Sequence, residues 1–154
     1  MLPYIWQNED KCYSSASATL VNGETIFSVT GGPILIKSIV SVCETANGAA
    51  LTTLQWQCAP TVGTATTISG ATAPLASAAA GTTIRLNNLS LAASPSVVAA
   101  SAGGVQIGQS VPNEILVPAG MIKSVVASGP STGTWKHYLR YTPMGPDSIV
   151  NGVA

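Results

Sequence analysis

The sequence of residues 34–58 is ILIKSIVSVCETANGAALTTLQWQC, and its alternation of apolar and polar side chains decides the fold class. A period of two is typical of strands, because successive side chains of a strand point to opposite faces. Residues 34–43 are apolar on both faces in their first half, which predicts a central or covered strand. Asn47-Gly48 is a turn signal, so we expect residues 50–58 to return beside the first strand as a hairpin.

The same alternation recurs on either side of this stretch. Residues 25–29 predict a short strand, and residues 121–128 and 134–142 predict a second hairpin around a glycine- and proline-containing turn. In residues 59–104 the contrast is weak, and we expect short strands at 66–68, 83–86 and 96–99, with one helical turn at 76–80 as an alternative. The inward faces of all these strands predict the core, which comprises Phe27, Ile34, Ile36, Val40, Leu54, Trp56, Val125, Trp135, Leu139 and Tyr141.

Helix signals are nearly absent, since the chain is rich in Thr, Val and Ser and contains fifteen glycines and ten prolines. Many short strands separated by turn signals predict an all-β fold, an antiparallel β-sandwich that is most simply jelly-roll-like. We expect an N-terminal arm (residues 1–17), one sandwich domain (residues 18–143) and a C-terminal tail (residues 144–154).

The chain has very little charge. Only 8% of its residues are charged, six basic and six acidic, against roughly a quarter in typical domains. Between Glu44 and Glu114 the single ionised side chain is Arg85. Low charge favours association, so we expect much of the surface to face other subunits; the rival interpretation is a surface hydrated by Ser and Thr, as on extracellular β proteins. Large aromatics make good anchors, and Tyr4, Ile5 and Trp6 are the candidate interface residues of an arm that docks on a neighbouring subunit.

Other function classes find little support in the residues. The neutral balance argues against a nucleic-acid partner, and no window has the length and hydropathy of a membrane span. We expect no catalytic, cofactor-binding or metal-binding residues: His137 is the only possible base of a triad and is more easily explained as a packed strand residue. Cys12, Cys43 and Cys58 lack metal-ligand spacing, and we expect three reduced, buried thiols in a protein made in a cytoplasm.

Several segments resemble small β-rich virion proteins of tailed phages. They are residues 26–36 (IFSVTGGPILI), 60–64 (PTVGT), 117–122 (VPAGMI) and 133–143 (GTWKHYLRYTP), and from the first to the last the match extends over residues 26–143, most of the chain. Such proteins look like head decoration or cement proteins. The resemblance implies a non-enzymatic homo-oligomer, expected to be a trimer, that binds the lattice of major capsid protein on the virion surface and stabilises the head. The alternative is a receptor- or glycan-binding module of a phage tail or fibre.

Overall fold

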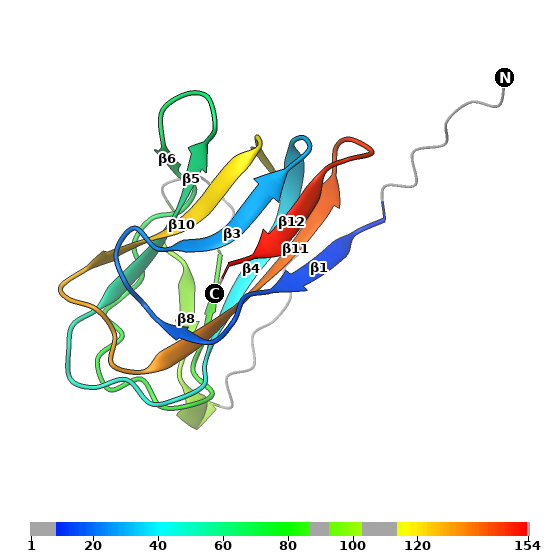
Figure 1. Ribbon diagram of the computed structural model, residues 1–154. Coiled ribbons are helices and arrows are strands. Elements are labelled where there is room, and N and C mark those ends of the chain that lie inside the picture. Colours follow the sequence, from blue (N-terminus) through cyan, green and yellow to red (C-terminus); the bar gives the residue numbers. More distant parts are fainter. Residues whose placement is uncertain (1–8, 87–92, 103–113, 154) are drawn as a thin grey trace, which may run out of the picture.

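The computed structural model describes residues 9–86, 93–102 and 114–153, and it is an all-β fold in which two antiparallel sheets pack face to face as a sandwich (Figure 1). This confirms the predicted fold class, while the jelly-roll topology stays a prediction. The described elements are β1 Lys11–Ser14, β2 Ala18–Thr19, β3 Thr25–Thr30, β4 Ile34–Cys43, β5 Thr53–Pro60, β6 Thr66–Thr67, β7 Thr83–Arg85, β8 Ser96–Val98, a 3₁₀ turn at Ala100–Ala102, β9 Ile115–Val117, β10 Gly120–Ala127, β11 Thr134–Pro143 and β12 Ile149–Gly152.

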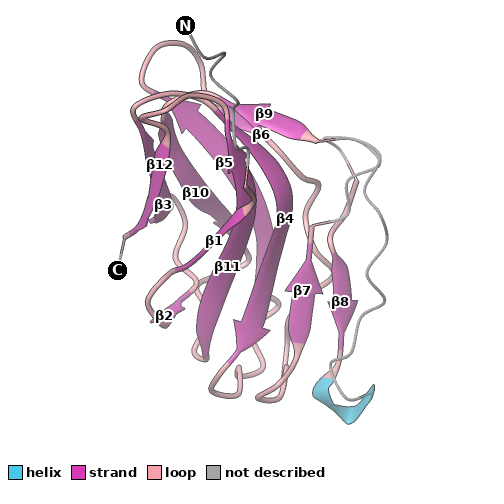
Figure 2. Ribbon diagram, turned by 90° about the vertical axis from the view of Figure 1, so that its right-hand side faces the viewer, coloured by secondary structure: helices cyan, strands magenta, loops and turns pink. Residues whose placement is uncertain are grey.

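The seven-stranded sheet has the order β1-β11-β4-β7-β8, with β2 paired to β11 and β9 paired to β4, and the five-stranded sheet has the order β12-β3-β10-β5-β6. Figure 2 shows β11, β4, β7 and β8 side by side in the first sheet. Strand β4 is central, as its two apolar faces predict. The short strands expected in the middle of the chain are confirmed by β6, β7 and β8.

Both predicted hairpins are wrong, because consecutive long strands lie in different sheets. Strand β4 belongs to the seven-stranded sheet and β5 to the five-stranded sheet, and the same holds for β11 and β10. The Asn47-Gly48 segment therefore bridges the two layers. Asn47 is 5% exposed, and its side chain is used inside the protein instead of at the tip of a hairpin.

The core lies between the sheets and contains Phe27, Ile34, Ile36, Leu54, Trp56, Trp135, Leu139 and Tyr141, all of which were expected there. Val40 is a correction, since it is only half-buried. Opposite β11, Arg140 pairs with Ser38 and Tyr141 with Ile36, so that β4 carries an extra residue at this point. Such a bulge inverts the alternation that follows it, and Ile39 is buried in place of Val40.

Val125 is a second correction. On β10 the inward side chains are Ile122, Ser124 and Val126, and Val125 is half-buried on the outer face. The inward position of Ser124 is stable because its hydroxyl donates a 2.6 Å hydrogen bond to the carbonyl of Val21. Because Val125 and Val126 are adjacent, hydropathy alone does not show which of them points inward. The buried, hydrogen-bonded Ser124 lies on the same face as Val126.

Sheet structure extends beyond the expected limits of the sandwich. Strand β1, in the expected arm, pairs with β11, and β12, in the expected tail, pairs with β3. Val150 of β12 is 1% exposed and belongs to the core. The candidate interface residues Tyr4, Ile5 and Trp6 lie outside the described residues.

Candidate interaction surface at one end of the sandwich

Four loops form one end of the sandwich: residues 31–33, 61–65, 118–119 and 144–148 (Figure 1, upper edge). They meet there because β3, β5, β9 and β11 all end at this edge, and hydrogen bonds join them in pairs. The N–H of Met144 donates to the carbonyl of Pro33 at 3.0 Å, and the N–H of Thr61 donates to that of Ala119 at 2.9 Å. We call this surface the proline end, because half of the chain's ten prolines lie in or beside its loops: Pro33, Pro60, Pro118, Pro143 and Pro146.

The proline end exposes large apolar side chains. Val62 is 90% exposed, and four further residues in or next to the loops are between 39% and 60% exposed: Leu116, Met121, Met144 and Ile149. Asp147 is the only charged residue within the four loops. Leu116 lies on the outer face of the seven-stranded sheet, whereas Met121 and Ile149 lie on the outer face of the five-stranded sheet. A single exposed apolar residue is ordinary, and several near one end of the sandwich favour a contact surface.

The shape of the proline end is held by close backbone contacts. Gly31 has a φ of 75°, and a β-carbon at this position would lie 1.8 Å from the carbonyl oxygen of Asp147. Only glycine fits there, so loops 31–33 and 144–148 pack directly against each other. The prolines fix φ in the same loops. Such rigid loops lose little conformational freedom when they bind a partner.

The opposite end, which we call the asparagine end, is formed by residues 20–24, 44–52 and 128–133. Its hub is the buried side chain of Asn47. The Asn47 amide donates to the carbonyl of Leu75 at 2.8 Å, and its oxygen accepts from the N–H groups of Thr132 at 2.9 Å and Gly133 at 3.2 Å. These bonds tie loops from both sheets together, which explains why the Asn-Gly turn does not form a hairpin.

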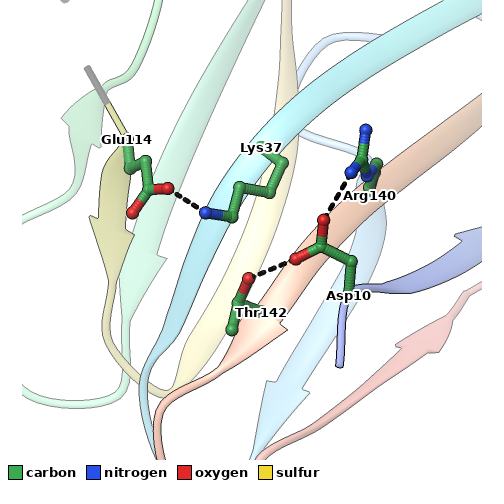
Figure 3. A network of polar contacts seen from close by, with 5 residues as sticks. All are labelled: Asp10, Lys37, Glu114, Arg140 and Thr142. Atoms are coloured by element: carbon green, nitrogen blue, oxygen red, sulfur yellow. Dashed lines mark hydrogen bonds and ion pairs between the residues drawn. The ribbon is translucent and has the colours of Figure 1, made fainter. Parts of the chain in front are cut away.

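A network of charged groups lies beside the proline end, on the seven-stranded sheet (Figure 3). The Asp10 carboxylate accepts a 2.6 Å hydrogen bond from the Thr142 hydroxyl and forms an ion pair with Arg140. These two contacts, the Thr142 bond first, lower the pKa of Asp10 below its ordinary value. The network fixes the start of β1 to the last residues of β11, and a second ion pair joins Lys37 to Glu114 nearby.

His137 lies in the interior, as its strand pattern predicts. It is 5% exposed, and its Nδ1 shares a 2.5 Å hydrogen bond with Ser41 Oγ, which is fully buried. Burial lowers the pKa of His137 to about 4, so the ring is neutral at pH 7. A small cavity lined by His137, Ser15 and Glu24 has room for about one water molecule. The serine and histidine therefore form a buried, hydrogen-bonded polar pair.

The three cysteines differ in exposure. Cys43 and Cys58 are buried free thiols, as expected, and burial raises the pKa of both. Cys12 is exposed on the edge strand β1, which corrects the expectation that all three are buried. The expectation rested on the residue type, whereas all four residues of β1 are exposed at the edge of the sheet.

Within residues 9–86, 93–102 and 114–153, no group of three or more His, Cys, Asp or Glu side chains is placed to bind a metal ion. In the same ranges no helical segment has the length and hydropathy of a membrane span. Comparison with protein-family models, with curated proteins and with solved structures yields no match. The proline end is thus a site defined by its geometry alone.

Sequence reasoning missed the proline end. Its turns were each visible, as Gly31-Gly32-Pro33 and Pro118-Ala119-Gly120 show, but they lie far apart in the sequence. Their meeting follows from strand order, which the false hairpin signal concealed. The candidate interface at Tyr4, Ile5 and Trp6 falls outside the described residues, and the structure brings no other predicted site residue to the surface.

Proposed function

We propose that the protein is a non-enzymatic virion structural protein, a capsid decoration protein that forms homo-oligomers, expected to be trimers, and reinforces the phage head by binding its lattice of major capsid protein. The observation that carries the proposal is the proline end, where exposed apolar side chains lie in or next to loops that contain one charge. A surface of this kind suits contact with another protein surface better than it suits water.

Repetition makes a modest contact effective. Burial of apolar surface contributes about 25 cal/mol per Å², and part of this is lost to the cost of association. On a shell the same contact occurs in many copies, so small contributions add over the lattice. The formal net charge of zero supports dense packing, because neighbouring copies repel one another little.

The charged side chains are distributed unequally between the outer faces of the two sheets. The outer face of β11 carries Lys136 and Arg140, with Lys136 Nζ 5.9 Å from the centre of the Tyr138 ring. On the outer face of the five-stranded sheet, Lys123 stands among uncharged residues such as Gln55 and Gln57. Charge is therefore concentrated on one layer of the sandwich, and the other layer is free for extended contact.

The test is to mix the purified protein with undecorated, expanded heads of the phage that encodes it and to measure bound copies per head by sedimentation. We expect saturable binding at a fixed stoichiometry and an increased resistance of the heads to heat. Light scattering of the free protein counts its subunits. A protein that stays monomeric and does not bind heads contradicts the proposal, and specific binding on a glycan array in that case favours the glycan-binding alternative.

A further inference from the structure

We infer that the proline end is the docking surface for residues 2–6 of a second copy of this chain, so that Tyr4, Ile5 and Trp6 of one subunit cover Val62 and its apolar neighbours on the next. The inference rests on the proposed self-association and adds the surface and the segment through which it occurs. It is argued from where residues 1–8 join the described chain, from their composition and from the side chains that the proline end exposes.

The segment joins the sandwich at the proline end. Strand β1 runs antiparallel to β11, with Lys11 opposite Tyr141, close to the point at which β11 ends. Asp10 is fixed there by its contacts with Thr142 and Arg140, as Figure 3 shows. Residues 1–8 therefore join the chain near the last residues of β11, toward the proline end and not at the far end of the molecule.

Direction and reach favour a neighbouring subunit. From Ser14 to Lys11 the chain follows β11 toward its last residue, so residues 1–8 join the sandwich on the side of the proline end. Val62 of the same subunit follows β5, which is separated from the edge strand β12 by β3 and β10, whereas β1 is an edge strand of the other sheet. Eight residues span at most about 26–29 Å when extended, more than twice the distance of about 10 Å between packed sheets.

The segment and the surface match in chemistry. Residues 1–8 are Met-Leu-Pro-Tyr-Ile-Trp-Gln-Asn and include no Asp, Glu, Lys or Arg. The proline end offers Val62, Met121 and Ile149 with the single charge of Asp147 in its loops. Aromatic residues bury a large area and lose little rotamer freedom, which is why Tyr and Trp anchor interfaces. Docking would cover apolar groups on both sides without stranding a charge.

Cross-linking between labelled copies tests the inference directly. The photoreactive residue p-benzoylphenylalanine is introduced at position 62, where the 90% exposed side chain leaves the fold undisturbed. Copies labelled with ¹⁵N and unlabelled copies are mixed, irradiated and digested with trypsin, which releases residues 1–11 as one peptide because Lys11 is the first basic residue. We expect cross-links between position 62 of one copy and residues 1–11 of the other, recognised by their mixed isotopes.

A pair of matched variants provides a second measurement. Trp6→Ala and Val62→Glu should each raise the dissociation constant of the oligomer at least about 10-fold, as measured by sedimentation over a range of concentrations. Leu51→Glu is the control, since Leu51 is 60% exposed but lies at the asparagine end. It should leave the oligomer unchanged.

Three outcomes overturn the inference: cross-links only within one copy, cross-links only to segments other than residues 1–11, or an oligomer that Trp6→Ala and Val62→Glu leave intact. Head binding by the wild-type protein is measured separately. If the oligomer binds heads but position 62 forms no cross-link to residues 1–11 of another copy, this inference is wrong and the proposed function is unaffected.

Discussion

At the asparagine end, polar side chains bind the backbone of neighbouring loops, whereas at the proline end apolar side chains in or next to the loops are exposed. Asn47 alone makes three contacts with backbone groups of Leu75, Thr132 and Gly133. At the proline end, by contrast, Val62 is 90% exposed. The two ends of one sandwich can thus differ in purpose: one closes the fold, and the other is available for contact.

The largest effect on the free energy of unfolding is expected for Asn47→Ala at the asparagine end. The substitution leaves the N–H groups of Thr132 and Gly133 without their partner, while the Leu75 carbonyl keeps only the N–H of Ala78. Each unsatisfied buried group costs about 1–3 kcal/mol. We expect the free energy of unfolding to fall by about 3–5 kcal/mol, measured by urea denaturation. A loss below about 1 kcal/mol would mean that the hub is not needed to close this end.

The second effect is acid destabilisation through His137, whose cavity lies toward the asparagine end. Its pKa is lowered to about 4 in the folded protein, from 6.5 as its ordinary value. The unfolded chain therefore binds a proton at a pH at which the fold does not, so stability is complete above pH 6.5 and falls as the pH drops toward 4. The loss approaches about 3 kcal/mol.

Urea denaturation of the wild type and of His137→Gln between pH 7 and pH 4 measures this contribution. The variant should be less stable at pH 7 but should lack this part of the pH dependence. Asp10, whose pKa is lowered, loses its contribution only as the pH falls below about 4, so the two groups are separable. Parallel curves for the two proteins would exclude His137 as the cause.

A smaller effect is expected where the chain joins the proline end. Asp10→Ala removes the hydrogen bond from Thr142 and the ion pair with Arg140. Because the site is exposed, the global loss should be about 0.5–1 kcal/mol. Hydrogen exchange should show faster opening of β1 and unchanged protection of β4. Equal acceleration in both strands would mean that Asp10 supports the whole sandwich and not the junction.

The smallest effect on stability is predicted for the exposed apolar residues themselves. Val62→Ser and Leu51→Ser remove side chains that are 90% and 60% exposed, so each should change the free energy of unfolding by less than about 0.5 kcal/mol. The two variants should differ only in self-association, which Val62→Ser weakens. A large loss of stability in dilute Val62→Ser would show that this residue is part of the fold and not of a contact surface.

The sequence predicts strands far better than it predicts their partners. Alternation located β3, β4, β10 and β11 closely, and even the short strands of the alanine-rich middle were found. The predicted pairing of β4 with β5 is wrong because an Asn-Gly sequence is compatible with two structures. Its backbone can form a tight hairpin turn, or the asparagine side chain, here that of Asn47, can bind distant loops. Only tertiary contacts with residues such as Thr132 decide between them.

Core prediction failed where the alternation is interrupted. The bulge at Lys37 inverts the faces of the second half of β4, and no residue type announces it. On β10 the buried residue is Ser124, whose bond to a backbone carbonyl cannot be foreseen from hydropathy. The proline end was missed for a related reason, since its loops are adjacent only once strand order is known. Residue patterns show local periodicity, whereas this surface is formed by loops that are distant in the sequence, so the patterns alone do not predict it.

The unequal exposure of the cysteines has a practical consequence. With Cys43 and Cys58 enclosed and Cys12 on the surface of an edge strand, a maleimide reagent should modify the folded protein at a single position without any mutation. A gold cluster or fluorophore attached there would mark each copy at a known point, 2 residues from Asp10. Electron microscopy could then locate this point in any assembly that the protein forms.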